Sequence, residues 1–343
     1  MMFSLEELRD AHRIVREALR PTPAFSWPLL ARRLGAEIVV KHENHHPTGA
    51  FKVRGGVTFV DSFRRRAPHA RGLISATRGN HGQSLAFAGR RLGIPVAIVV
   101  PRGNSTEKNA AMRALGAELI EYGLDFQAAR EEAQRLAEER GVEIVPAFHR
   151  DLSLGVATYA LELFGDRPDL DALYVPIGQG SGICGCIAVR DALGLKTEIV
   201  GVQATQAPAY ALSFAAGRAV STESSDTLAD GMATRVPDEQ ALAIIRRGAA
   251  RIVLVTDAEI AAAIRAYWSD THNLAEGAGA AALAAALQEK SRLAGGRVGV
   301  ILSGGNIDFE LFQRWVAPTH RAAVERQAFS EPGPARRHEG LTA

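Results

Sequence analysis

A lysine flanked by glycines and small residues is the first feature of the sequence that could do chemistry. Residues 41–56 read KHENHHPTGAFKVRGG, with Lys52 between Gly49 and the pair Gly55 and Gly56. Glycines let the backbone approach a ligand closely, and an amine in a partly desolvated pocket loses its proton readily enough to act as nucleophile and base. A lone lysine near glycines is more often a surface residue, so Lys52 needs support from the rest of the sequence.

A second stretch, residues 75–83, combines small and polar residues and reads SATRGNHGQ. It runs from the expected end of a strand into a helix, so backbone N–H groups converge there with the side chains of Thr77, Asn80 and His81. This arrangement predicts a site for an anion, either a carboxylate or a phenolate oxygen. His81 fits equally well as a donor to the anion or as a structural residue at the helix start.

The third stretch, residues 176–185, is rich in glycine and reads PIGQGSGICG. It follows an expected strand and opens an expected helix, which is the geometry of a phosphate nest. It lacks the Gly-Lys-Ser/Thr ending of an ATP-binding P-loop, and no clean Gly-x-Gly-x-x-Gly pattern with a second acidic strand end points to NAD. We therefore expect a phosphate-bearing ligand other than ATP or NAD.

Short β-branched runs that alternate with segments of helical period must position these three stretches. We expect strands at residues 37–41, 72–76, 95–101, 118–122, 142–146, 173–177, 198–203, 251–255 and 298–303, and helices at residues 83–92, 106–115, 126–140, 257–269 and 277–289. The alternation predicts an α/β protein with largely parallel sheets. These strands are too many for one small sheet, so we expect two sheets in two lobes, with loop crossings at residues 44–49 and 146–154.

Composition and charge exclude several classes of protein. Of 343 residues, 47% are hydrophobic and 23% are charged, and the formal net charge is only +2, so we expect no nucleic-acid partner. No run approaches the roughly 20 apolar residues of a membrane span, and residues 4–19 are amphipathic rather than a targeting leader, which predicts a cytoplasmic protein without a membrane partner. Cys184 and Cys186 are too close for a structural disulfide and too few for a zinc site, so we expect them buried and reduced.

Together and in this order, the three stretches resemble the fold-type II pyridoxal phosphate enzymes, specifically the threonine dehydratase and serine racemase group. A fourth segment, LSGGNID at residues 302–308, fits the same family, and the resemblance extends from about Pro21 to Asp308. Several ordered motifs over most of the chain are a far more specific signal than one motif, so the surface-lysine interpretation of Lys52 no longer holds.

The resemblance implies a fold like that of the tryptophan synthase β subunit: two α/β domains with open, twisted, mostly parallel sheets and the cofactor in the cleft between them. Residues 1–73 and 149–317 would form the large cofactor-binding domain and residues 74–148 the small domain. Residues 318–343 are rich in arginine, proline and glutamate with little periodicity, which predicts a disordered tail.

The resemblance assigns a role to each motif residue toward pyridoxal 5'-phosphate. Lys52 would hold the cofactor as a Schiff base, Phe51 would stack near the ring, and Asn80 would hydrogen-bond its phenolic oxygen. Ser303 would meet the pyridine nitrogen, and Glu276 would lie near the ring or, alternatively, stabilise the first turn of the helix that follows it. The phosphate would be cradled by Gly178, Gln179, Gly180, Ser181 and Gly182.

The activity implied is dehydration of a β-hydroxy L-amino acid. A neutral hydroxyl at Ser303 cannot hold the pyridine nitrogen protonated, so the ring is a mild electron sink, which suits α,β-elimination. Lys52 would remove the Cα proton, and the β-hydroxyl would leave with a proton from Lys52 or the cofactor phosphate, giving a 2-oxo acid and ammonia. The substrate is expected to bind at Thr77, Arg78, Gly79, Asn80 and His81.

Arg78 departs from the family pattern. In serine racemase a serine at the matching position is the second base, and an arginine, which stays protonated, disfavours racemisation. Arg78 could equally well point to solvent; facing the substrate, it would favour an acidic or aromatic side chain, so serine, threonine, phenylserine and 3-hydroxyaspartate all remain open. An amino acid racemase is the second hypothesis, and a non-catalytic amino-acid or cofactor-binding protein is a third, which retention of Lys52, Asn80 and Ser303 disfavours.

Further positions also differ from the family. Gln203 and Ala209 stand where the racemase group has metal-binding carboxylates, so we expect no metal. Residues 146–155, PAFHRDLSLG, replace the acidic segment common in threonine dehydratases and are expected near the substrate side chain. The chain ends soon after the last motif, so no regulatory domain for isoleucine feedback is expected, and the resemblance implies a homodimer.

Overall fold

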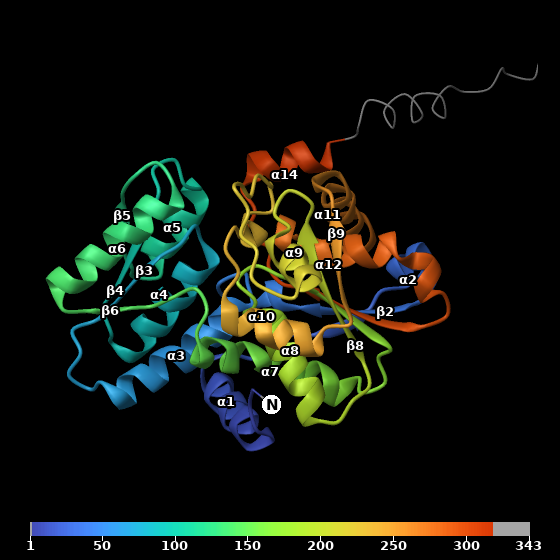
Figure 1. Ribbon diagram of the computed structural model, residues 1–343, viewed down its shortest axis with the longest axis horizontal. Coiled ribbons are helices and arrows are strands. Elements are labelled where there is room, and N and C mark those ends of the chain that lie inside the picture. The colour runs from blue at the N-terminus through green and yellow to red at the C-terminus, as the bar shows by residue number, and fades with distance from the viewer. Residues whose placement is uncertain (1, 318–343) are drawn as a thin grey trace, which may run out of the picture.

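Two open sheets form the framework of the protein (Figure 1), and the computed structural model describes residues 2–317. The large sheet has six strands: β1 (Ala24–Ser26), β2 (Glu37–His42), β7 (Ala172–Pro176), β8 (Glu198–Ala204), β9 (Arg251–Val255) and β10 (Arg297–Leu302). The small sheet has four: β3 (Leu73–Ala76), β4 (Val96–Val100), β5 (Glu118–Glu121) and β6 (Glu143–Ile144). Their orders are β1-β2-β10-β7-β8-β9 and β5-β4-β3-β6, and apart from the antiparallel β1–β2 pair the strands pair in parallel.

Helices alternate with these strands along the chain, as parallel sheets require. They are α1 (Leu5–Ala18), α2 (Pro28–Leu34), α3 (Lys52–Arg66), α4 (Asn80–Leu92), α5 (Thr106–Ala114), α6 (Phe126–Arg140), α7 (Arg150–Asp166), α8 (Ser181–Ala192), α9 (Ala209–Ala216), α10 (Glu239–Gly248), α11 (Asp257–Thr271), α12 (Gly277–Gln288), α13 (Lys290–Leu293) and α14 (Phe309–Val316). Two short 3-10 helices, η1 (Glu43–His45) and η2 (Asp230–Met232), precede α3 and α10.

Helices cover both faces of each sheet. In β7, Tyr174 packs in a hydrophobic cluster with residues of α11 and α12, whereas its neighbour Leu173 packs with residues of α7 and α8. In β4, Ile98 packs with residues of α3 and α4, and Val99 with residues of α6. Because successive side chains of a strand point to opposite faces, both sheets are buried on both sides.

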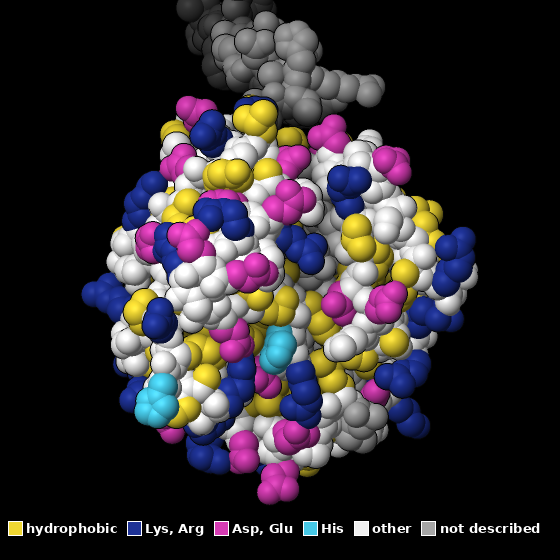
Figure 2. All heavy atoms as spheres, turned by 60° about the vertical axis from the view of Figure 1, so that its left-hand side comes forward, with side chains coloured by type: hydrophobic (Ala, Val, Ile, Leu, Met, Phe, Trp, Pro, Cys, Tyr) yellow, Lys and Arg dark blue, Asp and Glu magenta, His cyan; other side chains and the backbone are white. Residues whose placement is uncertain are grey.

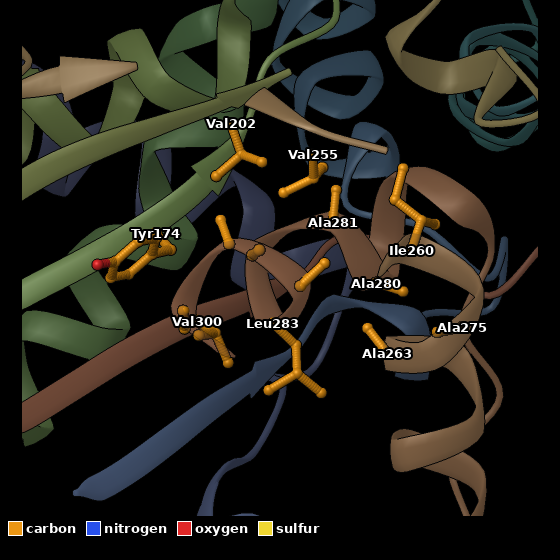
Figure 3. Close-up of a cluster of buried hydrophobic side chains, with 14 of the residues drawn as sticks. Tyr174, Val202, Val255, Ile260, Ala263, Ala275, Ala280, Ala281, Leu283 and Val300 are labelled. Atoms are coloured by element: carbon orange, nitrogen blue, oxygen red, sulfur yellow. The ribbon is translucent and has the colours of Figure 1, made fainter. Parts of the chain in front are cut away.

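Helix α12 is the most completely buried element near the site. It reads GAGAAALAAALQ, and a helix that is apolar all round belongs in a core. Figure 3 shows Ala280, Ala281 and Leu283 of this helix among the buried side chains of the large sheet. The small side chains let the helix lie close to the strands, so its first residues are held rigidly near the ends of β10 and β7.

The predicted fold class is confirmed, with differences at particular segments. Every expected strand is present, although only Glu143–Ile144 of residues 142–146 forms β6. Strand β1 was not predicted, because three residues are too few to show alternation. The expected loop at residues 146–154 is wrong in its second half: α7 begins at Arg150, since the His149 side chain accepts a hydrogen bond from the Asp151 N–H and caps the helix.

The boundaries of the two domains stay a prediction, which we propose as residues 1–73 and 149–317 against residues 74–148. The small sheet runs from Leu73 to Ile144, so it begins one residue before the proposed small domain, and α3 also packs with its residues. The predicted tail at residues 318–343 lies outside the described residues.

On the face shown in Figure 2, basic and acidic side chains are interspersed. In residues 2–317, no helix is both long and apolar enough to cross a membrane.

Candidate active site

Segments that follow the carboxyl ends of strands in both sheets meet in one pocket. Ligands of parallel α/β sheets bind at these ends, because the loops there are free to carry polar groups. The pocket is lined by Phe51, Lys52, Asn80, Pro176, Gly178, Gln179, Gly180, Ser181, Gly182, Gly231, Met232, Glu276, Ala278 and Ser303. The structure thus brings together every residue that the sequence places at the cofactor, from segments far apart in the chain.

Lys52 is the first residue of α3, and its amine lies 4.7 Å from the centroid of the Phe51 ring. Desolvation lowers the pKa of the Lys52 amine to about 8, and the nearby Glu276 carboxylate partly opposes that shift. A lysine with this pKa is a neutral amine for an appreciable fraction of the time near neutral pH. The site therefore supplies a nucleophile that an ordinary surface lysine would not.

Glu276 and Asn80 are hydrogen-bonded across the pocket. The Asn80 Nδ2 atom donates to Glu276 Oε1 at 2.7 Å, and Asn80 Oδ1 accepts from Asn306 Nδ2 at 2.8 Å. Burial raises the pKa of Glu276 to about 7, and its Oε2 atom has no hydrogen-bond partner within the described residues. Although Glu276 occupies the N-cap position of α12, its carboxylate makes no capping hydrogen bond, so its contacts favour the interpretation of a residue near the ring.

The turn between β7 and α8 has the shape of a phosphate cradle. Gly180 is the N-cap of α8 with φ +100°, a left-handed conformation that favours glycine. A Cβ atom on Gly178 would lie 2.3 Å from the Gly231 carbonyl oxygen, and one on Gly180 would lie 2.7 Å from the Cβ of Ala241. Glycine is therefore required at both positions, and the first N–H groups of α8 are left to bind an anion.

The segment expected to bind the substrate lies beside the pocket, but only Asn80 lines it. The Thr77 hydroxyl accepts a hydrogen bond from the Gly79 N–H at 3.1 Å and so fixes the turn into α4. His81 is buried, which lowers the pKa of its imidazole to about 3, and its Nε2 atom has no partner within the described residues. Arg78 is exposed and is not among the pocket residues, so its placement favours the solvent-facing alternative. Their substrate-binding roles stay predictions.

A network of buried charged side chains fixes the first turn of α3, the helix that begins at Lys52. Arg54, two residues further along α3, is fully buried and donates to both oxygens of Glu43 and of Glu162 at 2.7 to 2.9 Å. Lys41 donates to Glu162 at 2.7 Å. Buried charges of this kind must be paired, so the network fixes the first turn of α3 to η1, β2 and α7.

Several residues at the site were not found from the sequence. Gly231 and Met232 line the pocket, Asn306 orients Asn80, and Lys108 of α5 forms an ion pair with Asp230. The only available signal for Lys108 was its position shortly after the expected end of a strand, where ligand-binding residues gather. Asn306 stands in the segment at residues 302–308 that carries the family resemblance, whereas Gly231 and Met232 lie in a segment with no strong periodicity or motif.

The stretch expected near the substrate side chain does not reach the pocket. Of residues 146–155, His149 caps α7 and Arg150 pairs with Glu7 of α1 at 2.6 Å, and none lines the pocket. Gln203 accepts a hydrogen bond from the backbone N–H of Ala211 through Oε1. In residues 2–317, no group of three or more His, Cys, Asp or Glu side chains is placed to hold a metal ion.

The residues present fit pyridoxal phosphate. The glycine cradle at α8 suits a phosphate, and the Lys52 amine suits a carbonyl group. The buried Glu276 Oε2 atom has no hydrogen-bond partner within the described residues, as expected where a polar ligand binds. Asn80 uses one of its two amide hydrogens on Glu276, so the other is free for a ring substituent.

The sequence is similar to characterised enzymes over nearly its full length. An L-threonine ammonia-lyase of Geobacter sulfurreducens is 37% identical, over 88% of this chain and 75% of its own. An L-threo-3-hydroxyaspartate ammonia-lyase of Saccharomyces cerevisiae is 32% identical, over 89% of this chain and 94% of its own. Among solved structures, a pyridoxal 5'-phosphate-dependent aspartate racemase superposes with a TM-score of 0.85 at 27% identity, over 90% of this chain and 97% of its own.

The match to a protein-family model agrees with the geometry of the pocket. The model for pyridoxal-phosphate dependent enzymes matches residues 15–304, which span Lys52, the cradle at α8 and Ser303. The cofactor of this protein is pyridoxal 5'-phosphate, and the chain belongs to the family of pyridoxal-phosphate dependent enzymes.

Proposed function

We propose that the protein removes water from a β-hydroxy L-amino acid by α,β-elimination and releases a 2-oxo acid and ammonia. The observation that carries this proposal is the Lys52 amine, desolvated and of lowered pKa, in one pocket with a phosphate cradle and the uncharged Ser303. The relatives named threonine ammonia-lyase and L-threo-3-hydroxyaspartate ammonia-lyase support the same reaction class.

Different residues of the pocket would bind the cofactor and transfer the proton. When bound, pyridoxal phosphate supplies an electron-withdrawing ring that stabilises negative charge at the substrate Cα. The N–H groups at the start of α8 hold the phosphate, the free amide hydrogen of Asn80 binds the phenolic oxygen, and the Ser303 hydroxyl meets the pyridine nitrogen. Lys52 Nζ takes the Cα proton, because its lowered pKa lets it accept and release a proton near neutral pH.

The substrate would lie between this pocket and the start of α4. Its carboxylate binds N–H groups and side chains of residues 77–81, where the helix dipole favours an anion. The β-hydroxyl would leave as water with the proton that Lys52 has taken from Cα, and hydrolysis of the enamine product would then give the 2-oxo acid and ammonia.

Racemisation is the second candidate, because an aspartate racemase shares the fold at 27% identity. It requires a second base opposite Lys52. Arg78 stands where the racemase group has its serine, and a guanidinium group is a hydrogen-bond donor that does not serve as a base. Elimination, which needs a single base, is the reaction that these residues support.

We also propose a cytoplasmic homodimer. Cys184 and Cys186 are free and buried, which suits a reducing compartment. Phe25 of the edge strand β1 and Leu29 of α2 are 47% and 48% exposed, and apolar side chains of this size at a sheet edge support a protein contact.

The test is to incubate the holoenzyme with serine, threonine, phenylserine and 3-hydroxyaspartate, with both β-epimers where they exist, and to measure 2-oxo acid. We expect oxo acid from one of them with the wild type and none with Lys52→Ala, which also loses the visible absorption of lysine-bound cofactor. Interconversion of amino-acid enantiomers without oxo acid would contradict the proposal and favour the racemase.

A further inference from the structure

Lys108 is a cation at the edge of the active site that the proposed mechanism does not use. It lies in the first turn of α5, and its side chain is only 9% exposed. Its ammonium group forms an ion pair with Asp230 of η2, so the contact joins a helix beside the small sheet to a segment beside the large sheet. A buried lysine costs free energy unless its charge is matched, so this position calls for an explanation.

Both ends of the ion pair lie beside the site. A Cβ atom on Gly79 would lie 2.6 Å from Lys108 Cδ, which places the lysine stem against the turn that opens α4. Asp230 directly precedes Gly231, which lines the cofactor pocket. Lys108 therefore lies between the segment proposed to bind the substrate carboxylate and the wall of the cofactor pocket.

The two partners differ in how freely they can move. The Asp230 side chain is 35% exposed, against 9% for Lys108. Asp230 can turn toward water at little cost, whereas the buried Lys108 ammonium, whose charge the Glu276 and Asp308 carboxylates also stabilise, stays in place. An incoming carboxylate could thus take the place of Asp230, and the buried cation would stay paired throughout.

The other cations that the sequence places near the substrate are elsewhere. Arg78 is exposed, and Arg150 is paired with Glu7 of α1. Lys52 is committed to the cofactor. Unlike these three side chains, Lys108 is a buried cation beside the site and can recognise a second negative charge on the substrate.

We propose that Lys108 binds the side-chain carboxylate of an acidic β-hydroxy amino acid of the 3-hydroxyaspartate type, and that Asp230 pairs with the lysine while that substrate is absent. The inference rests on the proposed dehydratase function and names its substrate class. It adds a specificity-determining residue, not a catalytic one.

The rival explanation is that the ion pair only holds the two parts of the protein together. Such contacts exist beside it: the Ser105 hydroxyl donates to Asp308 at 2.5 Å, and the Phe309 N–H donates to Glu107 at 2.9 Å. A purely structural pair would be broken equally by removing either partner. A substrate-binding lysine with a competing aspartate gives effects of opposite sign.

The experiment compares L-aspartate with L-asparagine, which share a shape, differ by one negative charge and carry no β-hydroxyl to eliminate. Their dissociation constants are measured by calorimetry on the holoenzyme for the wild type, Lys108→Met, Lys108→Arg and Asp230→Asn. The Michaelis constants for 3-hydroxyaspartate and threonine are measured beside them. Circular dichroism checks that each variant is folded, and if Asp230→Asn is not, the two Lys108 variants decide.

We expect Lys108→Met to weaken aspartate and raise the Michaelis constant for 3-hydroxyaspartate by about tenfold or more, as the loss of a charge-assisted hydrogen bond would, with little change for asparagine and threonine. Lys108→Arg should restore part of the loss, and Asp230→Asn should strengthen aspartate. The proposal would be overturned if Lys108→Met weakened aspartate and asparagine, or 3-hydroxyaspartate and threonine, to the same extent. It would also be overturned if Lys108→Met and Asp230→Asn changed the affinity for aspartate in the same direction, or if the wild type did not bind aspartate more tightly than asparagine. Binding needs no turnover, so a wild type that makes no oxo acid would defeat the dehydratase function separately.

Discussion

The lowered pKa of Lys52 determines how fast the apo-protein can take up its cofactor, because only the neutral amine attacks a carbonyl. With a pKa of about 8, the neutral fraction rises about tenfold per pH unit up to pH 7 and levels off above pH 8. We therefore expect the rate constant for cofactor uptake to follow that curve, measured by visible absorption after mixing. A rate that keeps climbing toward pH 10 would indicate an unshifted lysine, and Lys52→Ala should develop no band.

Glu276 should make the stability of the apo-protein depend on pH in a predictable direction. Its pKa is about 7 in the folded chain, against about 4.5 when unfolded, so the folded state binds the proton more tightly. The resulting stability is fully present below pH 4.5 and is lost as the pH rises through about 7. Glu276→Gln, which imitates the protonated acid, should match the wild type near pH 5 and exceed it near pH 8 in urea unfolding. A difference that stays constant across this range would contradict the raised pKa.

Single residues also mark the limit of prediction from the sequence. Lys52 and Asn80 could be identified because their motifs resemble those of a known family, and the glycines of the α8 turn because a glycine-rich turn between a strand and a helix is typical of a phosphate site. Lys108 and Asp230 carry no local signature, because their pairing arises only when the two sheets meet. The outward placement of Arg78 likewise depends on packing around α4 and not on the motif that contains it.

Among the elements, the turn from β7 into α8 offers a sharp test of the phosphate cradle. Gly180→Ala forces an alanine into φ +100° and brings its Cβ 2.7 Å from Ala241, so we expect a loss of about 1 to 2 kcal/mol in stability and at least about tenfold in cofactor affinity. Gly194→Ala is the matched control: it also has a left-handed backbone, φ +65°, but no atom within 4 Å of the new Cβ. It should lose stability without losing cofactor affinity, as followed by fluorescence titration. Equal losses of cofactor affinity in the two variants would contradict a role of the Gly180 turn in binding the phosphate.

The ends of helices and strands agree with prediction where the hydrophobic periodicity is strong. They differ where a capping side chain or a tertiary contact determines the first residue of the helix. Helix α6, Phe126–Arg140, and strand β9, Arg251–Val255, agree with their predicted ranges. The start of α4 was placed three residues late, at Gln83 instead of Asn80, because its first turn has no apolar face. The start of α7 depends on a histidine cap, which is not among the common capping residues.

For the whole molecule, the ionic network around Arg54 links α1, β2, η1, α3 and α7, elements that the sequence separates widely. Its members carry no common pattern in the sequence, because they lie in segments as different as residues 41–46, KHENHH, and the helix that contains Glu162. Only the fold shows that Arg54 and Lys41 balance Glu43 and Glu162, so that no net charge is buried.

Removing one member of that network should therefore cost far more than removing a surface ion pair. Arg54→Leu leaves two buried carboxylates without their main cation, for which we expect a loss of about 3 to 5 kcal/mol in the free energy of unfolding. Arg113→Leu is the control, since Arg113 pairs with Glu121, both side chains are exposed, and such pairs contribute about 1 kcal/mol or less. Urea unfolding of both variants beside the wild type measures the difference. Similar losses in the two would mean that water or a rearranged partner compensates Glu43 and Glu162, and that the first turn of α3, with Lys52, is held by apolar packing alone.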